Sequence, residues 1–353
     1  LIFTFNYRSL VLDAKPVVGA RPLGSLRISE AGLGMLNLAL DKQEDPDAAA
    51  ALKASVEAGC NFVDTAEAYG FGSSERLAAW AAQQVGIKIG TGEGELHVAT
   101  KFAPVPWRPD ASSVVDACRA SAERLGVDTI PLYQIHFPDI IQPFKVFGLE
   151  TRKDELYWEG LAQCYEKGLA ANVGVCNYGP GMVERVHSFL AARGIPLASN
   201  QINYSLMYRK DADATVSKCK ELGVPVIAYF PLANGLLAGR YDADNMPPFP
   251  KSLTMKKYVL GDGTDSFPTG GYTPLLTEMR RVAAERGKTV PQVAINWVIC
   301  KGAIPIPGAR NAEMATTNMD AMQWRLTDAE VEALEMASDA CGFEFSSGGF
   351  KLE

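Results

Sequence analysis

The strongest constraint on the fold is a repeated alternation of short apolar runs with longer amphipathic segments, which begins at about residue 30. This alternation is typical of βαβ units, in which helices connect parallel strands. Eight apolar runs have the length of strands: 33–38, 61–65, 97–101, 130–136, 171–177, 197–202, 224–229 and 303–306. Eight strands with intervening helices predict an α/β fold, the (β/α)8 TIM barrel, and 353 residues suit that fold with insertions.

The helical segments mostly end at a glycine, the residue that best adopts a left-handed helix terminus. Ten helices are predicted: 47–58, 74–85, 113–125, 154–167, 181–193, 211–222, 274–286, 291–301, 311–321 and 328–338. The first eight precede Gly59, Gly86, Gly126, Gly168, Gly194, Gly223, Gly287 and Gly302. Ser113 with Asp116, and Thr327 with Glu330, have the spacing of capping boxes. A doubly wound open sheet is the alternative fold, but no Gly-x-Gly-x-x-Gly follows the first strand.

Two regions depart from the simple repeat. The helices 274–286 and 291–301 both precede the eighth strand, so one of them is extra. Residues 240–272 hold four prolines and four glycines and are much longer than a usual βα loop, which predicts a functional lid after the seventh strand. No linker composition occurs, so residues 1–353 are expected to form one domain, with a C-terminal helix and tail over 322–353.

Composition excludes several classes of function. The formal net charge of -7 argues against a nucleic-acid partner, and no apolar stretch is long enough to span a membrane. The seven cysteines are scattered without a Cys-x-x-Cys pair, which favours a reducing compartment over a disulfide or zinc framework. With only three histidines, no metal site is expected. Residues 1–10 lack a signal-peptide core.

Six consecutive strands carry a polar side chain at or near the carboxyl end, the end that faces the active site in a barrel. The six residues are Asp64, Lys101, His136, Asn177, Gln201 and Tyr229. A single histidine or lysine at such a place is more often structural than catalytic. Six polar residues at corresponding ends of consecutive strands instead indicate that this end of the barrel is a functional face.

Asp64, Tyr69, Lys101 and His136 together form an acid site in this prediction. A free phenol has a pKa of about 10, and a neighbouring ammonium is expected to lower it, while a carboxylate keeps that ammonium charged. The histidine donates a hydrogen bond to the same substrate oxygen. Such a group protonates an oxygen on which charge develops as hydride reaches a carbonyl carbon. No side chain supplies hydride, so a cofactor is implied.

Other residues suggest where a nicotinamide cofactor lies. The amides of Asn177 and Gln201 can pair with a carboxamide, and the ring of Tyr229 can stack on a pyridine. In the segment "IPIPGARNAEMATTN", Gly308 lets backbone approach a phosphate at a helix start, and Arg310 adds a positive charge.

These motifs resemble the aldo-keto reductase family, through nearly the whole chain. "RPLGSLRISEAGLG" resembles its opening hairpin and first strand, and "FVDTAEAYG" its segment from Asp to Tyr. "GVCNY", "NQINYSL", "AYFPL" and "IPIPGARNAE" resemble its cofactor-binding blocks. "RGIPLASNQINYSLMYR" and "PQVAINWVICKGAIPIPGARNAEMA" are similar to the plant and algal branch, whose members are often plastid proteins.

The resemblance implies a barrel that binds NADP(H) across its carboxyl face, without a metal. Tyr69 would be the proton donor, Lys101 and Asp64 its tuning pair, and His136 would orient the carbonyl. Arg310 would contact the 2′-phosphate, and a clamp within 240–272 would cover the pyrophosphate. The implied cofactor-binding residues are Gly34, Met35, Cys176, Asn177, Gln201, Tyr229, Phe230, Pro231, Leu232, Gly308, Ala309, Arg310, Met314 and Asn318.

Three features of the sequence depart from the family pattern. Gly34-Met35-Leu36 stands where Gly-Thr-Trp is common, which removes a hydroxyl and an aromatic pocket wall. Cys176 replaces the usual Ser before the amide-binding Asn, and Met314 replaces an Arg or Gln that often faces the adenosine phosphate. These changes bear on cofactor affinity and substrate size.

The first functional hypothesis is NADPH-dependent reduction of a small aldehyde or ketone to the alcohol, in a plastid or the cytoplasm. The alternative is an NADP(H)-binding accessory or redox-sensing subunit of a larger assembly, with little turnover. A sugar isomerase on the same barrel would need a metal cluster or a different phosphate site. The substrate depends on loops 35–46, 103–112, 137–154 and 341–353, and Phe343, Phe345 and Phe350 form either an interface or a pocket wall.

Overall fold

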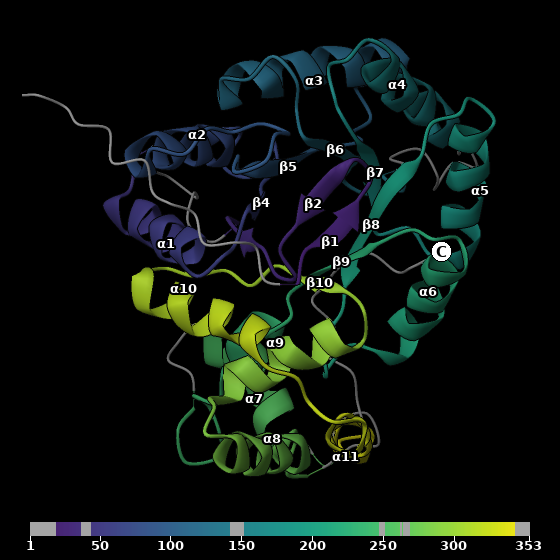
Figure 1. Cartoon of the computed structure of the whole chain (residues 1–353). Coiled ribbons are helices and arrows are strands. Elements are labelled where there is room, and N and C mark those ends of the chain that lie inside the picture. The colour runs from purple at the N-terminus through teal and green to yellow at the C-terminus, as the bar shows by residue number, and fades with distance from the viewer. Residues whose placement is uncertain are drawn as a thin grey trace, which may run out of the picture.

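Eight parallel strands form one sheet in the computed structural model, which describes residues 19–36, 44–141, 152–246, 251–261, 263 and 269–342. The strands are β3 (Leu33–Gly34), β4 (Phe62–Asp64), β5 (His97–Phe102), β6 (Leu132–Ile135), β7 (Val173–Cys176), β8 (Leu197–Asn203), β9 (Val226–Tyr229) and β10 (Ile304–Pro305). They lie side by side in sequence order. Figure 1 shows the strands as a ring with helices outside it.

Hydrogen bonds between the first and last strands close the sheet. Gly32 N donates to Pro305 O at 2.9 Å, and Gly34 N donates to Pro307 O at 3.1 Å. Gly34 and Gly308 also form a parallel bridge. A Cβ on Gly34 would lie 2.7 Å from Ile306 O, so glycine is required for this close approach. The predicted (β/α)8 barrel is confirmed.

The helices follow the predicted order. They are α1 (Pro46–Glu57), α2 (Ser73–Val85), α3 (Ala111–Leu125), α4 (Asp154–Glu166), α5 (Pro180–Ala191), α6 (Lys210–Glu221), η2 (Ala233–Ala238), α7 (Lys251–Leu260), α8 (Thr273–Arg286), α9 (Val290–Cys300), α10 (Ala312–Met319), η3 (Asp320–Gln323) and α11 (Asp328–Ala340). All eight glycines predicted to follow helices have left-handed φ, between +60° and +92°. The chain therefore turns at these glycines after each of those helices.

Three details of the prediction were wrong. Helix α3 begins at Ala111 because the Asp110 side chain accepts the Ser113 N–H at 3.1 Å, so Ser113 and Asp116 do not form its capping box. Helix α7 lies inside 240–272, where no helix was predicted. Strand β3 ends at Gly34, and residues 37 and 38 of the expected strand lie outside the described residues.

An N-terminal hairpin, β1 (Arg21–Leu23) and β2 (Leu26–Ile28), precedes the barrel as the sequence predicted. It appears at the centre of the ring in Figure 1. Its apolar side chains Leu23, Leu26 and Ile28 pack with residues from the barrel strands, namely Phe62, Ala99, Leu132, Ala198, Ile227 and Ile304. Ser25 N donates to the Asn172 side chain at 2.7 Å. The hairpin therefore closes the interior of the barrel at the end opposite the carboxyl ends of the strands.

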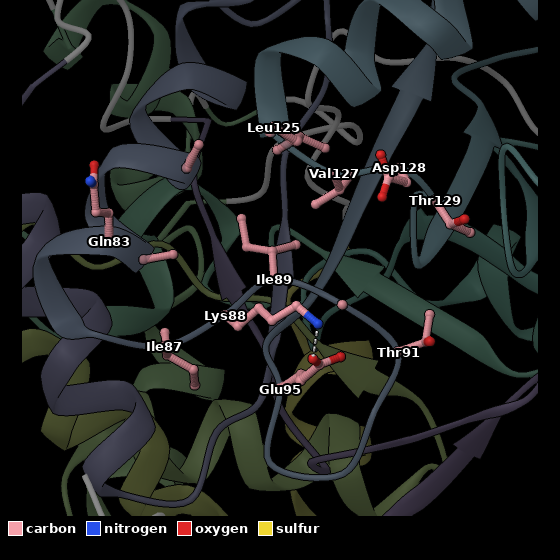
Figure 2. A pocket seen from close by; sticks show the side chains of 14 residues that line it. Gln83, Ile87, Lys88, Ile89, Thr91, Glu95, Leu125, Val127, Asp128 and Thr129 are labelled. Carbon is pink, nitrogen blue, oxygen red and sulfur yellow. Dashed lines mark hydrogen bonds and ion pairs between the residues drawn. The ribbon is translucent and has the colours of Figure 1, made fainter. Parts of the chain in front are cut away.

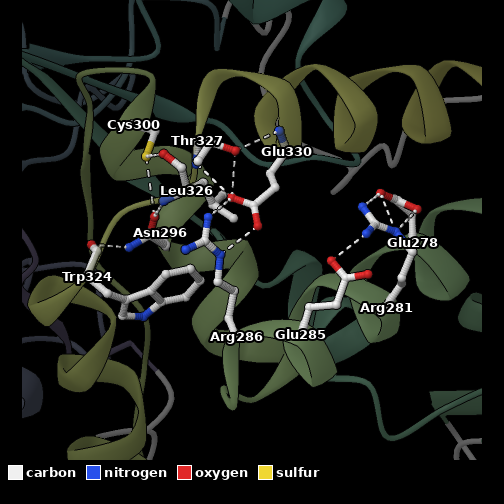
Figure 3. A network of polar contacts seen from close by, with 10 residues as sticks. All are labelled: Glu278, Arg281, Glu285, Arg286, Asn296, Cys300, Trp324, Leu326, Thr327 and Glu330. Carbon is white, nitrogen blue, oxygen red and sulfur yellow. Dashed lines mark hydrogen bonds and ion pairs between the residues drawn. The ribbon is translucent and has the colours of Figure 1, made fainter.

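Helices α8, α9 and α11 form a layer outside the barrel, held by the contacts in Figure 3. Arg286 on α8 donates from Nε and Nη2 to the two carboxylate oxygens of Glu330 on α11, at 2.7 and 2.6 Å. Glu330 also completes the predicted capping box with Thr327, which is confirmed. Asn296 of α9 binds the backbone of residues 321, 324 and 326. The end of the described chain is thereby fixed to helices α8 and α9.

None of the helices in the described part of the chain has both the length and the apolar character needed to cross a membrane.

Candidate active site

The polar residues singled out in the sequence lie at the carboxyl ends of six neighbouring strands. Asp64 and Tyr229 are the last residues of β4 and β9, and Lys101 and Gln201 lie in the second halves of β5 and β8. His136 and Asn177 directly follow β6 and β7. Because all these strands are parallel, the six side chains belong to one end of the barrel.

Lys101 is the centre of the site and has no exposed surface. Its Nζ donates to Asp64 Oδ1 at 2.6 Å, to Thr65 O at 2.7 Å and to Tyr69 Oη at 3.4 Å. An ammonium has three donors, so each of them has an acceptor. The second oxygen of Asp64 accepts the Gln201 amide at 2.7 Å. Lys101 and Asp64 are thus a buried ion pair whose polar atoms are satisfied by hydrogen bonds.

Burial is the largest single effect and lowers the pKa of Lys101, but the charge and hydrogen bond of Asp64, together with Tyr69 and Cys176, outweigh it, so the pKa lies above its ordinary value. The lysine therefore remains an ammonium at neutral pH. A charged group in this dry environment acts strongly on its neighbours, because little water screens it.

The pKa of Tyr69 is raised to about 12, mainly by burial, while Lys101 acts in the opposite direction. The sequence-based expectation that the ammonium lowers this pKa below its ordinary value is therefore wrong for the net shift, although the direction of the lysine's effect is correct. The phenol keeps its proton at neutral pH.

His136 lies next to Tyr69, with ring centroids 5.6 Å apart in an edge-to-face arrangement. Burial, and then the charge of Lys101, lower its pKa to about 3. The ring is therefore neutral at physiological pH. Its Nδ1 is buried without a hydrogen-bond partner among the described residues. A neutral imidazole can donate one hydrogen bond from the ring nitrogen that carries the hydrogen.

Asn177 connects His136 to Tyr229. Its Nδ2 donates to His136 O at 2.9 Å, and its Oδ1 accepts the Tyr229 hydroxyl at 2.7 Å. The backbone of Asn177 is left-handed, with φ of +64°, a conformation that asparagine tolerates better than most residues. Phe230 also has positive φ, and its ring packs edge-on against Tyr229 at 5.1 Å. Pro231 is buried and Leu232 is half-buried.

A second group of predicted residues lies where the barrel closes. Asn318 Nδ2 donates to Gly308 O at 3.3 Å, and Asn311 caps α10 by accepting the Met314 N–H at 2.9 Å. Arg310 is exposed just before this helix, and no ion pair joins it to any residue that the structure describes. A free cation beside a helix N-terminus fits an anionic group such as a cofactor phosphate.

The remaining predicted cofactor-binding residues are buried or half-buried. Met35 N donates to Asp64 O at 3.0 Å, which places the altered 34–36 segment beside the acid site. Cys176 ends β7, and burial raises the pKa of its thiol. The Cys176 thiol is therefore not a thiolate at neutral pH. Ala309 is buried and Met314 is half-buried.

Two acidic residues that were not singled out in the sequence also contact this region. Glu67 and Glu75 lie on either side of Tyr69 in the sequence; Glu67 binds Ala103 just after β5, and Glu75 binds Thr100 on β5. The sequence could have indicated them, because they are two acids in a stretch otherwise rich in small and apolar residues. Nothing in the sequence indicated the hydrogen bond from the Gln201 amide to Asp64.

A cavity of about 500 Å³ lies elsewhere, between the C-terminal ends of α2 and α3, and Figure 2 shows the Lys88–Glu95 ion pair beside it. Its lining residues 87–91 and 125–129 precede β5 and β6, so it belongs to the end of the barrel opposite Lys101. It is not the candidate site.

All seven cysteines are free. Within the described ranges, no cluster of three or more His, Cys, Asp or Glu side chains could hold a metal ion.

Comparisons with known proteins show similarity over most of the chain. The model of the "Aldo/keto reductase family" matches residues 30–339. A pyridoxal reductase of Arabidopsis thaliana described as chloroplastic is 37% identical over 328 residues, which cover 90% of this chain and 85% of that protein. An uncharacterized oxidoreductase of Mycobacterium tuberculosis is 33% identical, over 80% of this chain and 79% of its own.

Solved structures are similar in fold at lower identity. A glycerol dehydrogenase from Gluconobacter oxydans has a TM-score of 0.73 and 24% identity, with 92% of this chain and 95% of that chain covered. An aldo/keto reductase from Klebsiella pneumoniae, solved with NADP and acetate, has a TM-score of 0.68 and 22% identity, with 96% and 99% covered.

Proposed function

The chain belongs to the aldo/keto reductase family of oxidoreductases, and on that premise we propose that it reduces a small aldehyde or ketone to the alcohol with NADPH. The observation that carries the proposal is the buried Lys101 ammonium, which lies between the Asp64 carboxylate and the Tyr69 hydroxyl. This arrangement supplies a proton donor whose conjugate base is stabilised by a fixed positive charge.

In the proposed reaction, bound NADPH supplies hydride to the carbonyl carbon. The carbonyl oxygen accepts hydrogen bonds from His136 and Tyr69 and gains negative charge as the C=O π bond breaks. Tyr69 then gives its proton to that oxygen. The resulting phenolate is stabilised by Lys101 Nζ, which is 3.4 Å from the Tyr69 oxygen. Asp64 keeps the lysine charged, so the positive charge is in place before the reaction begins.

The cofactor fits the polar groups that the site leaves available. The amides of Asn177 and Gln201 each keep hydrogen-bonding capacity beyond the bonds already made, so they can hold the carboxamide. Tyr229 is half-buried and can stack on the nicotinamide. Exposed Arg310 is the proposed partner of the 2′-phosphate. A clamp within 240–272 remains part of the proposal, and residues 247–250, 262 and 264–268 lie outside the described residues.

The first substrates to test are flat aromatic aldehydes of the pyridoxal type, because the similar Arabidopsis thaliana protein is named a pyridoxal reductase. The same relative motivates a plastid location, which a fluorescent fusion in plant cells would test by overlap with chlorophyll fluorescence.

The test compares the wild-type enzyme with Tyr69→Phe. We expect kcat to fall by about 10²- to 10⁴-fold, the range attributed to a general acid, while the NADPH Kd from cofactor fluorescence changes little. Activity that survives Tyr69→Phe would show that another group is the acid. A wild-type protein that binds NADPH but consumes none with a panel of aldehydes would instead support the accessory-subunit alternative.

A further inference from the structure

The loop that carries Tyr69 crosses the carboxyl end of β5 and is tied to it on both sides of Lys101. Before Tyr69, Glu67 Oε1 accepts the backbone N–H of Ala103 at 2.7 Å. After Tyr69, Glu75 Oε1 accepts the hydroxyl of Thr100 at 2.6 Å. Thr100 and Ala103 are near neighbours of Lys101 along the chain. The two carboxylates therefore hold the Tyr69 loop and the catalytic lysine in one frame.

Glu75 is completely buried in the first turn of α2. Its other oxygen accepts the Arg124 Nε–H from α3. Arg124 also lies against the loop, because a Cβ on Gly72 would be 2.7 Å from Arg124 Cδ. The neighbouring Ser74 accepts a hydrogen bond from Thr65 at 2.7 Å. The segment after Tyr69 is thereby fixed to β5, to the residue that follows β4 and to α3.

Glu67 has the same arrangement on the other side. Both of its oxygens accept hydrogen bonds from the guanidinium of Arg108, which also donates to Ala103 O at 3.1 Å. The Arg108 guanidinium lies 4.7 Å from the Phe102 ring centre, and the Tyr157 hydroxyl donates to Arg108 O at 2.8 Å. Each carboxyl group therefore has an arginine that orients it; at Glu75, burial raises the pKa and Arg124 acts in the opposite direction.

The loop between these ties turns through left-handed backbone directly after Tyr69. Gly70 and Gly72 have left-handed φ, and Phe71 between them also has positive φ and is 97% exposed. The contact that must be held is the 3.4 Å from Tyr69 Oη to Lys101 Nζ, which is near the upper limit for a hydrogen bond. A shift of about 1 Å in a reacting group can reduce the rate by about 10²-fold.

We propose that Glu67 and Glu75 are positioning residues that keep the Tyr69 hydroxyl beside Lys101. They act through the loop and do not touch the substrate. The proposal rests on Tyr69 as the proton donor, so it deepens the proposed function. The competing explanation is that the two ion pairs only stabilise the fold, in which case their loss lowers stability without a separate effect on hydride and proton transfer.

The experiment uses Glu67→Gln, Glu75→Gln and the double variant, because glutamine keeps the shape but loses the charge. Glu330→Gln is the matched control, since Glu330 is also an acid paired bidentately with an arginine, but on α11 (Figure 3). We expect kcat to fall about 10-fold for each site variant and about 100-fold for the double, with the NADPH Kd within about twofold of wild type. The control should lose thermal stability and keep its kcat.

A kinetic isotope effect separates positioning from stability. With NADPH deuterated at the transferred position, the isotope effect on kcat should rise in the two site variants, because hydrogen transfer becomes slower than product release. Wild-type kcat and isotope effects in both variants would overturn the proposal. An equal loss of kcat in Glu330→Gln at a similar drop in melting temperature would also overturn it. Thr100→Val, which removes only the hydroxyl bound by Glu75, gives the same test if Glu75→Gln does not fold.

Tyr69→Phe, measured in parallel, distinguishes the two levels of the proposal. If that variant keeps wild-type activity, the proposed acid is wrong and positioning falls with it. If it is inactive while the glutamate variants behave as wild type, the function stands and the positioning role is refuted.

Discussion

Tyr69 shows how burial and charge compete at a single residue. The positions of the acid-site residues could be predicted because polar residues after apolar runs mark the carboxyl ends of strands. The net pKa of Tyr69 could not, because burial depends on which distant side chains surround the ring. The same limit applies to Gln201, whose bond to Asp64 joins residues on β8 and β4.

The pKa values predict how carbonyl reduction depends on pH. The pKa of Tyr69 is about 12, so the phenol keeps the proton that it donates. The pKa of His136 is about 3, so its ring stays neutral through the neutral pH range. We expect kcat for reduction to be flat between about pH 5 and about pH 9, measured with saturating NADPH and aldehyde. A bell-shaped profile centred near neutrality would contradict these protonation states.

His136 should also make stability depend on pH. Its pKa falls from 6.5 to about 3 on folding, so between these values the unfolded chain binds the proton more readily. The stabilising contribution of the neutral ring is therefore complete above 6.5 and is lost as pH falls toward 3. The free energy of unfolding can be measured in urea at one pH above 6.5 and at one pH between 3 and 6.5. The difference between the two values should be smaller for His136→Asn than for wild type.

Arg310 allows a separate prediction about cofactor choice. Replacing it with methionine removes one exposed charge before α10 and should raise the NADPH Kd by about 10- to 100-fold, because a charge-assisted bond to phosphate is lost. The NADH Kd should not change, since NADH has no 2′-phosphate. Arg27→Met, an exposed arginine on the opposite hairpin, is the control in the fluorescence titration. Equal weakening of both cofactors would contradict the assignment.

At the scale of single elements, local signals predicted helix ends better than helix starts. The eight glycines were reliable because left-handed backbone after a helix strongly favours a residue without Cβ. The start of α3 was wrong because Asp110 and Ser113 are both good caps, and only the structure shows which side chain turns back to the backbone. Helix α7 was missed because the prolines and glycines around it suggested an unbroken loop.

The cap of α3 can be tested directly. Asp110→Ala should lower the free energy of unfolding by about 1 kcal/mol, the usual cost of removing an N-cap side chain. Ser113→Ala should cost less, because the Ser113 N–H bound by Asp110 belongs to the backbone and is retained. Chemical denaturation of both variants would compare them, and the reverse order would restore the capping box expected from the sequence.

At the scale of the whole molecule, the barrel was predictable because its repeat recurs eight times, so errors of a few residues at single strands did not affect it. The hairpin beneath it was recognised only by resemblance, since two three-residue strands carry little pattern of their own. Its fit depends on apolar side chains from strands throughout the chain.

The hairpin should matter for global stability. Leu26 is 2% exposed and packs into the apolar cluster at the closed end of the barrel. Leu26→Ala should lower the free energy of unfolding by about 2–5 kcal/mol, because it leaves a cavity there. The NADPH Kd should change little, since the cavity is at the end opposite Lys101. An exposed leucine, Leu156→Ala, is the control, and equal losses in both variants would show that the hairpin is not part of the core.

The contact between Gly34 and Gly308 has a consequence for synthesis on the ribosome. The strand that contains Gly34 is made early, and its closing partner emerges only when most of the chain has been translated. Until then both edge strands of the parallel sheet, β3 and β9, lack a partner on one side, and contacts between such distant residues form slowly. A nascent chain stopped before residue 304 should therefore be protease-sensitive and prone to aggregation. Chaperone protection during translation would matter most during that interval.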